Sequence, residues 1–227
     1  MKAKICVSIC PVTMTEAFHL IEESEKAQAE LIEVRLDLLK SHREIADLAT
    51  HGKTPKIATN KPLSSRGIFS GTETERRKTL LDAAKSGFEY VDIELSTTDL
   101  GEFVSQIKKT SAKTVLSFHD FSGTPNLSEL KGILEQEINT GADVCKVVTT
   151  AKRMEDNLTL LNFTSSASAK TRIVSFAMGE LGKTSRLLSP LFGGFFTFAS
   201  LKQGEETAAG QMGIQEMKTA YRLLGLT

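Results

Sequence analysis

The stretch "LIEVRLD" (Leu31–Asp37) carries a charged residue at every second position of an otherwise apolar run. Alternate residues of a β-strand share a face, so Glu33, Arg35 and Asp37 lie together and the apolar residues between them lie on the opposite face. If helices cover the apolar face, the charged face points into the interior of a closed sheet. A buried charge is costly unless it is paired, so this strand predicts a barrel whose interior holds a polar site.

The same arrangement recurs in three other strand-like stretches of the chain. Each places ionisable side chains on one face and apolar side chains on the other. At least three carboxylates, an arginine, a histidine and a lysine would then share one interior, which is too costly for packing alone and indicates a functional site. The stretches are "YVDIEL" (Tyr90–Leu95) with Asp92 and Glu94, "TVLSFHD" (Thr114–Asp120) with His119, and "VCKVV" (Val144–Val148) with Lys146.

Apolar runs of strand length alternate with helical patterns along the whole chain. Thr13, Ser41 and Thr72 each precede a glutamate by three residues, which predicts a capping box and a helix start. The alternation predicts an α/β protein, a (β/α)8 TIM barrel forming a single domain over residues 1–227, with an open doubly wound sheet as the alternative. The expected strands are Ile5–Cys10, Leu31–Leu36, Lys56–Asn60, Tyr90–Leu95, Thr114–His119, Val144–Thr149, Arg172–Phe176 and Phe195–Ala199.

Composition narrows the classes of function. Lysine plus arginine and aspartate plus glutamate number 28 each among 227 residues, which favours neither nucleic acid nor an acidic membrane surface as a partner. The first residues are too polar for a secretory signal and no apolar run approaches a membrane span, so we expect a cytoplasmic protein. The odd set of cysteines, Cys6, Cys10 and Cys145, is typical of reduced thiols in that compartment.

A lysine and a histidine in one barrel interior suggest chemistry at a carbonyl group. We expect burial and nearby cations to lower the pKa of Lys146 toward neutrality, so that its amine can form a Schiff base with a ketone. His119 would remove a proton beside the imine and later protonate a leaving hydroxyl. Dehydration, aldol cleavage and isomerisation all fit this pair. The other histidines lack metal-ligand spacing, so no metal is expected.

Seven short motifs resemble type I 3-dehydroquinate dehydratase, in the same order and over nearly the whole chain. Each motif is weak alone, whereas their spacing, one per βα unit, is specific. The resemblance implies a (β/α)8 barrel that converts 3-dehydroquinate to 3-dehydroshikimate through a lysine imine, in the shikimate pathway of aromatic amino acid biosynthesis. The motifs are "EVRLD" (Glu33–Asp37), "YVDIE" (Tyr90–Glu94), "SFHDF" (Ser117–Phe121), "DVCKV" (Asp143–Val147), "MGELGKTSR" (Met178–Arg186), "LFGGFFTFA" (Leu191–Ala199) and "TAAGQ" (Thr207–Gln211).

The resemblance also implies roles for individual positions. Lys146 matches the lysine that forms the imine, and His119 matches the general acid and base. Asp92 and Glu94 are expected to support these two residues. The positions that match substrate contacts are Ser8, Glu33, Arg35, Lys61, Arg186, Thr207 and Gln211, with Thr207 in place of the usual serine.

The loop after the third strand departs from the family pattern. The family has T-x-R-x-x-x-E-G-G, and this chain has "TNKPLSSRGIF" (Thr59–Phe69). Lys61 replaces the arginine, Ser65 the glutamate and Arg66 a glycine. A lysine cannot reproduce a bidentate guanidinium contact, so Arg66 is the candidate to supply that charge in support of the site. Without the glutamate, His119 also loses a carboxylate that is expected to orient it.

The stretch "AMGELGKTSRL" (Ala177–Leu187) is similar to a phosphate-binding P-loop, but Ala177 replaces its first glycine. Only one expected strand follows, and it carries no acidic residue for Mg²⁺. In the barrel interpretation the loop turns tightly at Gly179 and Gly182, and Arg186 binds the substrate carboxylate.

The resemblance implies a small-molecule substrate, no cofactor and a homodimer. Three alternatives stay open at this point. A class I aldolase or transaldolase would also use a barrel lysine, a P-loop protein would bind a nucleotide, and a non-catalytic binder would follow if the departing loop has lost its function.

Overall fold

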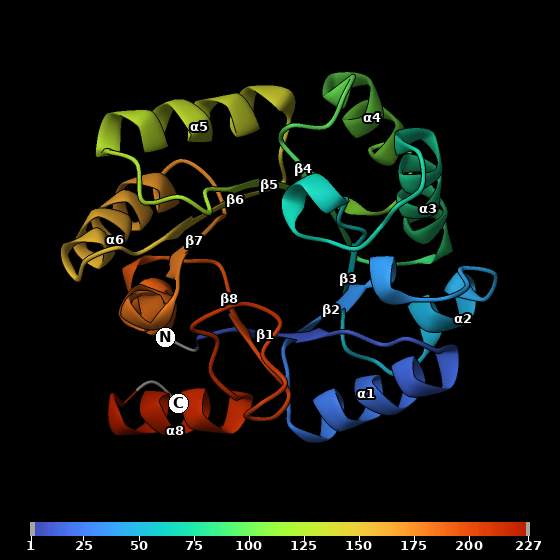
Figure 1. The fold of residues 1–227 in the computed structure, drawn as a ribbon, viewed down its shortest axis with the longest axis horizontal. Helices are drawn as coiled ribbons and strands as arrows, with labels where there is room; N and C mark the ends of the chain where they lie inside the picture. Colours follow the sequence, from blue (N-terminus) through green and yellow to red (C-terminus); the bar gives the residue numbers. More distant parts are fainter. Residues whose placement is uncertain (1–2, 226–227) are drawn as a thin grey trace.

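The computed structural model describes residues 3–225, which form one (β/α)8 barrel (Figure 1). This confirms the predicted fold class, and residues 1–2 and 226–227 of the predicted domain lie outside the described residues. The strands are β1 (Ile5–Ile9), β2 (Leu31–Arg35), β3 (Lys56–Thr59), β4 (Tyr90–Glu94), β5 (Lys113–His119), β6 (Val144–Thr150), β7 (Ile173–Met178) and β8 (Thr197–Ala199). The α-helices are α1 (Met14–Lys26), α2 (Ile45–Thr50), α3 (Glu73–Ser86), α4 (Leu100–Ile107), α5 (Leu127–Thr140), α6 (Glu155–Ser168), α7 (Lys183–Leu188) and α8 (Ile214–Leu223).

All the strand pairs are parallel, and the strands follow the order β7-β6-β5-β4-β3-β2-β1-β8. Between β7 and β8 the described residues form no strand ladder. There the amide of Phe195 donates to the carbonyl of Ile173 over 2.7 Å and brings the two edges together. The sheet thus curls into a nearly closed barrel, and the open-sheet alternative is wrong. Each expected strand occurs, with its ends displaced by two residues at most.

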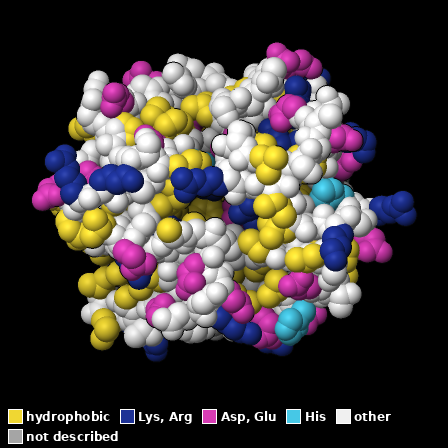
Figure 2. Space-filling model, in the orientation of Figure 1, with side chains coloured by type: hydrophobic (Ala, Val, Ile, Leu, Met, Phe, Trp, Pro, Cys, Tyr) yellow, Lys and Arg dark blue, Asp and Glu magenta, His cyan; other side chains and the backbone are white. Residues whose placement is uncertain are grey.

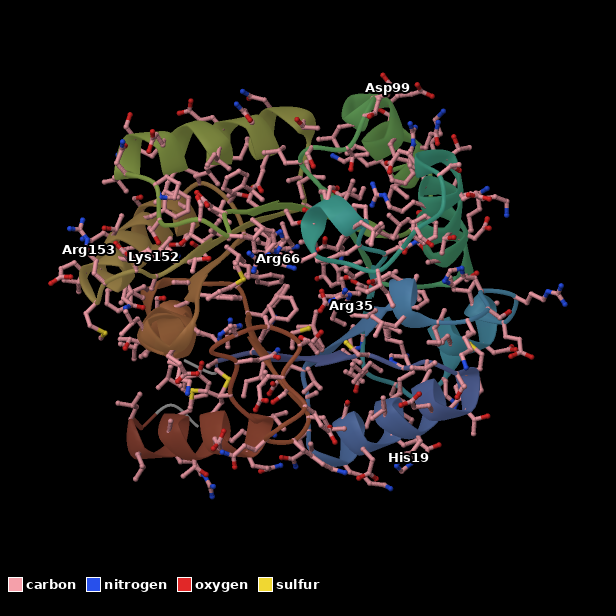
Figure 3. All side chains as sticks on the ribbon, in the orientation of Figure 1. His19, Arg35, Arg66, Asp99, Lys152 and Arg153 are labelled. Atoms are coloured by element: carbon pink, nitrogen blue, oxygen red, sulfur yellow. The ribbon has the colours of Figure 1, made fainter. Side chains whose placement is uncertain are left out.

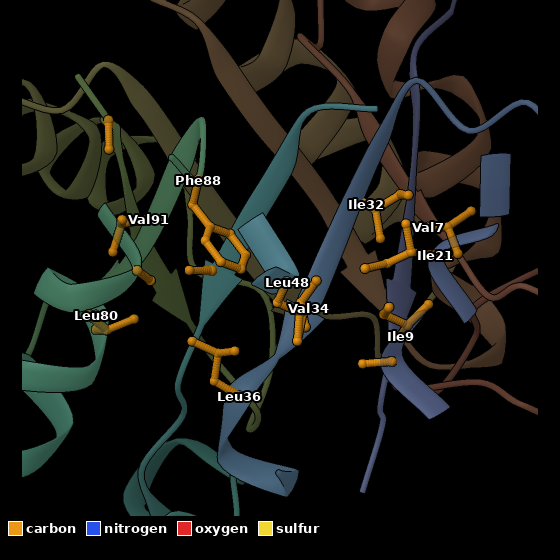
Figure 4. Packing of buried hydrophobic residues seen from close by; sticks show 14 of the residues in the cluster. Val7, Ile9, Ile21, Ile32, Val34, Leu36, Leu48, Leu80, Phe88 and Val91 are labelled. Atoms are coloured by element: carbon orange, nitrogen blue, oxygen red, sulfur yellow. The ribbon is translucent and has the colours of Figure 1, made fainter. Parts of the chain in front are cut away.

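Two apolar layers hold the barrel in shape. The outer layer fills the space between strands and helices, where residues such as Ile21, Val34 and Phe88 are buried (Figure 4). Burying one such side chain away from water stabilises the folded protein by about 1.5–3 kcal/mol. The inner layer lies inside the barrel and includes Cys6 and Val144. The faces inferred for the four charged strands are therefore confirmed, because the residues of the inner layer share their face with the charged groups.

The inner face changes from apolar to polar along six of the strands. Two positions beyond an apolar residue of the inner layer, each of β1 to β6 carries a polar side chain that points the same way. On β7 and β8 the corresponding residues are Phe176 and Phe198. Apolar side chains thus close the barrel interior at one end. The next layer, toward the carboxyl ends of the strands, is polar on most sides. The apolar-to-polar pairs are Cys6–Ser8, Leu31–Glu33, Ile57–Thr59, Tyr90–Asp92, Val115–Ser117 and Val144–Lys146.

The helix starts agree with the sequence in two of three cases. The Thr72 hydroxyl accepts from the Glu75 amide over 3.2 Å, and the Glu75 carboxylate accepts from the Thr72 amide over 2.8 Å. Thr13 caps α1 in the same way through its hydroxyl, although the Glu16 carboxylate reaches back to Val12. The prediction for Ser41 is wrong, because α2 begins only at Ile45.

A histidine explains the missing cap. The Nε2 atom of His42 lies 2.7 Å from the carbonyl oxygen of Leu36, and this contact holds the segment in a turn. The Ser41 hydroxyl accepts only from the nearby Arg43 amide, over 3.3 Å. None of the helices in residues 3–225 is long and apolar enough to cross a membrane.

We expect Thr72→Ala to lower the free energy of unfolding by about 1 kcal/mol, because it removes the hydroxyl that accepts from the Glu75 amide and donates to the Glu75 carboxylate, while the backbone bond of the capping box stays. The matched control is Ser41→Ala, an equally exposed hydroxyl that caps no helix, for which a change within about 0.5 kcal/mol is expected. Urea denaturation of both variants measures the difference. Equal losses in the two variants would contradict the assignment of the cap.

Candidate active site

A cavity of about 340 Å³ opens at the end of the barrel where the strands finish. Figure 2 shows the hollow near the centre of that face, with basic and apolar side chains around it. Arg35 from β2 and Arg66 from the loop after β3 lie at this opening (Figure 3). Most of the predicted site residues line the cavity, and Ser8, Asp92 and Glu94 lie buried around its base. The predicted residues in the lining are Glu33, Arg35, Lys61, Arg66, His119, Lys146, Arg186, Thr207 and Gln211.

Lys146 on β6 lies in the base of the cavity among carboxylates. Its Nζ donates to Oδ2 of Asp92 over 2.8 Å and lies 3.7 Å from Oε1 of Glu33. The same nitrogen is 4.5 Å from the centre of the Phe198 ring, a cation–π distance. The side chain is 5% exposed, so these neighbours replace its hydration almost completely.

The expectation that the pKa of Lys146 falls toward neutrality is wrong for the free protein. Burial alone would lower this pKa, but the charges of Asp92 and Glu33 and the hydrogen bond to Asp92 raise it above its ordinary value. The nearby cations that the sequence suggested are offset by more carboxylates at shorter range. Lys146 therefore rests as an ammonium ion, and the same contacts lower the pKa of Asp92 despite its burial.

Glu33 is held rigidly below Lys146. Its Oε2 accepts from the hydroxyl of Ser8 over 2.5 Å, and its Oε1 accepts from the hydroxyl of Thr59 over 2.9 Å. Arg35, two residues on, does not pair with it. The Arg35 guanidinium instead donates to both oxygens of Asp37, over 2.8 and 2.6 Å. Glu33 and Arg35 thus enter the cavity as separate groups, each fixed by its own partner.

His119 ends β5 and is flanked by a carboxylate and an aromatic ring. Oε2 of Glu94 lies 3.4 Å from Nδ1, a close charge contact that lacks the geometry of a hydrogen bond. The Phe121 ring stacks on the imidazole with 5.9 Å between centroids and an interplanar angle of 10°. Burial and the charge of Lys61 lower the pKa of His119, against the opposing effect of Glu94, so the ring is neutral at pH 7.

Glu94 also corrects an expectation from the sequence. The glutamate replaced by Ser65 was expected to leave His119 without an orienting carboxylate, yet β4 supplies one. Asp92 and Glu94 project from the same strand two residues apart, so one reaches Lys146 and the other reaches His119. Asp92 and Glu94 thus lie beside the two residues that they were predicted to support, and the supporting role itself stays a prediction.

Arg186 on α7 is a buried cation with unused hydrogen-bond donors. The side chain is 1% exposed, and its Nε and Nη2 have no partner among the described residues. Its guanidinium carbon lies 4.2 Å from the centre of the Phe176 ring. Burial lowers the pKa of Arg186 to about 9, so the group is still charged at pH 7. An unpaired, charged fork in a cavity wall is suited to bind an anionic group of a ligand bidentately.

The loop between β8 and α8 covers one side of the cavity. Oε1 of Gln211 accepts from the amide and the hydroxyl of Thr207, over 2.7 and 3.1 Å. The loop rests on Gly179, whose amide donates to the carbonyl of Ala209 over 2.9 Å. Gly210 has a φ of 74°, and a Cβ there would lie 2.1 Å from the Gly179 carbonyl oxygen. Only glycine permits this close approach of two backbones.

Comparison with known proteins identifies the family. The model of the family described as type I 3-dehydroquinase matches residues 5–227. The chain belongs to the type I 3-dehydroquinase family. The predicted recognition and enzyme class are confirmed at this level, and TIM barrel and lyase are the terms that apply.

Individual relatives agree with the assignment to this family. A 3-dehydroquinate dehydratase of Dehalococcoides mccartyi (strain CBDB1) is 40% identical over 220 residues, 96% of each chain. A bifunctional 3-dehydroquinate dehydratase/shikimate dehydrogenase of Arabidopsis thaliana is 34% identical and spans 94% of this chain and 36% of that protein. The crystal structure of 3-dehydroquinate dehydratase from Geobacillus kaustophilus has a TM-score of 0.92 at 28% identity, covering 99% of this chain and 92% of that one.

Within this type I 3-dehydroquinase, the segment similar to a P-loop directs Arg186, and not Lys183, toward the cavity. The Lys183 ammonium pairs with Glu180 over 2.7 Å and is 43% exposed. Gly182 packs against Ala177, where a Cβ would lie 2.5 Å from the Ala177 carbonyl oxygen. The turn therefore brings α7 close against β7. Among the described residues no group of His, Cys, Asp and Glu is arranged to hold a metal ion.

Several residues around the site escaped the sequence analysis. Phe121 and Phe176 carry the rings beneath His119 and Arg186, and Thr59 holds Glu33. Asp37 fixes Arg35 and accepts from the amide of Ile68 over 3.1 Å, which ties the β3 loop to β2. Alternation places Thr59 on the inner face, so that pattern was a usable signal for it, and Asp37, which was already expected beside Glu33 and Arg35, lies in the turn just after β2. Nothing in the sequence marked the two aromatic contacts.

We expect Arg186→Met to leave the free energy of unfolding unchanged or to raise it by about 1 kcal/mol, because a buried unpaired charge is replaced by an apolar side chain of similar length. The matched control is Arg76→Met. Arg76 is 2% exposed, but its guanidinium donates to Glu73 and to the Asn60 carbonyl. Urea denaturation should show a loss of about 2 kcal/mol for the control. A comparable loss in Arg186→Met would mean that its guanidinium is paired in solution.

Proposed function

We propose that this type I 3-dehydroquinase dehydrates 3-dehydroquinate to 3-dehydroshikimate through a Schiff base on Lys146. The observation that carries the proposal is the pairing of Lys146 with Asp92 and of His119 with Glu94 in the base of one cavity. A nucleophile and a proton acceptor thus share a site from which water is largely excluded. The family supplies the substrate, and the geometry supplies groups for each step.

The substrate is an anion with a ketone and several hydroxyl groups, and the cavity has a partner for each. The carboxylate binds the free donors of Arg186. The ketone carbon lies against Lys146, and the hydroxyl groups meet Glu33 and Arg35. Arg66 adds a second cation at the opening, where its guanidinium carbon lies 4.1 Å from the centre of the Phe121 ring. Ser8, Thr207 and Gln211 complete the proposed set of contacts, whereas Lys61, which the family pattern also suggested, lies against Glu94 and Asp92.

The reaction begins with the loss of a proton from Lys146, since only the neutral amine is a nucleophile. Substrate that fills the cavity displaces water and makes the ammonium less favourable, and the neutral imidazole of His119 takes the proton. The amine adds to the ketone, and the protonated His119 gives its proton to the carbinolamine hydroxyl, which leaves as water and gives the iminium with a neutral imidazole. His119 then accepts a proton from the adjacent carbon and returns it to the hydroxyl that leaves as water. Hydrolysis of the conjugated iminium releases the enone and restores Lys146.

The remaining assignments follow from the same proposal. The reaction needs no cofactor, because the iminium itself withdraws the electrons. It would serve the shikimate pathway of aromatic amino acid biosynthesis in the cytoplasm. A homodimer without nucleic acid or membrane partners stays a prediction that measurement of mass in solution can test.

The experiment that tests the function is reductive trapping. Protein treated with 3-dehydroquinate and borohydride should lose activity and gain the mass of one reduced ligand, with peptide mapping placing the adduct on Lys146. Lys146→Ala should neither trap the ligand nor release the enone, which is followed by its absorbance. Lys183→Ala is the matched control and should do both. Turnover by the unaltered protein without any adduct would exclude the imine.

We expect His119→Ala to lower kcat by about 10²–10⁴-fold, the usual contribution of a positioned acid and base. Trapping at Lys146 should persist at a lower rate, because the lysine and its carboxylates stay in place but the imidazole that takes the lysine proton is gone. Steady-state kinetics and the trapping assay on one preparation measure both effects. An unchanged kcat would remove His119 from the mechanism.

A further inference from the structure

We propose that Lys61 is a positioning residue for the dehydration. Its ammonium holds the Glu94 carboxylate beside His119 and interacts with the Asp92 carboxylate that is paired with Lys146. This inference rests on the proposed function, because it concerns the same site. It gives Lys61 a role other than the substrate contact that its position in the family pattern implies.

The contacts of Lys61 are divided between the two carboxylates. Its Nζ contacts Oε1 of Glu94 and lies 3.7 Å from Oδ1 of Asp92. The second oxygen of Glu94 faces Nδ1 of His119 at 3.4 Å, and the second oxygen of Asp92 accepts from Lys146 at 2.8 Å. Each carboxylate therefore has one oxygen turned to Lys61 and the other to a reacting group. Removing the ammonium would free Glu94 to rotate, whereas Asp92 would stay held by the Ser117 hydroxyl, which donates to its Oδ1 over 2.8 Å, and by Lys146.

The backbone keeps Lys61 in this position. Its carbonyl oxygen accepts from the Phe69 amide over 3.2 Å, so the loop after β3 folds back over it. Gly67 makes this return possible, because a Cβ there would lie 2.0 Å from the same oxygen. The side chain is 11% exposed. A lysine fixed at its own backbone and buried at its tip can act as a structural charge between the two carboxylates.

The other cations of the cavity are better placed to meet an anionic substrate. Arg186 has two nitrogens without a partner among the described residues. Arg66 has a φ of 56°, lies on the Phe121 ring and forms no ion pair within residues 3–225. Both charges are therefore available, whereas the charge of Lys61 is already shared between two carboxylates.

The protonation of His119 depends on this arrangement. The charged groups that face it are Glu94 and Asp92 from β4, Lys61 after β3, and Lys146 from β6, with Arg66 beyond Phe121. Without Lys61, Glu94 would lose the ammonium that it contacts, and its charge would favour a protonated His119 more strongly. The imidazole would then hold its proton to higher pH and could not accept one from the substrate. Lys61 thus leaves Glu94 able to orient the ring without protonating it.

The test uses Lys61→Met, with Lys78→Met as the matched control on the exposed face of α3. His119 is titrated by NMR in the free protein, and kcat/KM is measured against pH, since it reports the essential base of the free enzyme. In Lys61→Met both the titration and the acidic limb should move to higher pH by about one unit. Then kcat/KM should fall by about tenfold on the acidic limb, below the pKa of His119 in the unaltered protein, and should approach the unaltered value at higher pH; Lys61→Arg should restore most of the loss. Lys78→Met should match the unaltered protein.

The outcomes separate this inference from the proposed function. If the unaltered protein neither turns over 3-dehydroquinate nor forms the borohydride adduct, the proposed function fails. If it does both, and Lys61→Met raises KM while the His119 titration stays in place, Lys61 is a substrate contact and the positioning role is wrong. Uniform loss of activity at every pH without a shifted titration also overturns it. If Lys61→Met does not fold, Lys61→Gln replaces it, because the amide can donate to Glu94 but carries no charge, and the same shift is expected.

Discussion

The buried ion pair between Asp92 and Lys146 is the constraint on which the site depends. An isolated charge at this depth would be too costly, and removing one partner of a buried pair typically costs about 3–5 kcal/mol. The pair does not stand alone, because Glu33 on one side and Lys61 on the other extend it across the barrel. The apolar layers outside and below the polar residues supply the favourable free energy that permits such an interior.

The barrel divides its interior between two kinds of support for charge. On β1 to β6, charges are balanced by opposite charges and hydroxyl groups. On β7 and β8, Phe176 and Phe198 lie against Arg186 and Lys146, so Arg186 meets an aromatic face instead of a carboxylate and Lys146 meets one beside its carboxylates. A ring holds a guanidinium in place without occupying its hydrogen-bond donors. Arg186 consequently keeps its donors for a ligand, whereas Lys146 is paired until the ligand arrives.

The sequence predicted the architecture well because strand alternation and burial are local properties. In "LIEVRLD" and the three other charged stretches, alternation predicted which face of the strand turns inward. In the structure the same face of each strand points into the barrel. The protonation state of Lys146 was not predictable in the same way. Whether its pKa is raised or lowered depends on whether Asp92 or a cation lies nearer to it in space. The resemblance named Asp92 and Glu94 together as supporting residues, but spacing along the chain could not say which of them lies beside His119, because the partners come from different strands. The absent cap at Ser41 has a similar origin, in a contact between His42 and Leu36.

A lysine that rests as an ammonium is compatible with imine chemistry and explains why the site is built around pairs. The carboxylates that raise the pKa of Lys146 also stabilise the positive charge of an iminium formed on the same nitrogen. The charge of the resting ammonium and the charge of the proposed iminium would thus occupy nearly the same point, so the surrounding groups would need little rearrangement between the two states. The free-energy cost arises in forming the short-lived neutral amine of Lys146, which lies on the path between the ammonium and the iminium. A neutral imidazole in the same cavity lowers that cost, which is why the charges around His119 matter as much as those around Lys146.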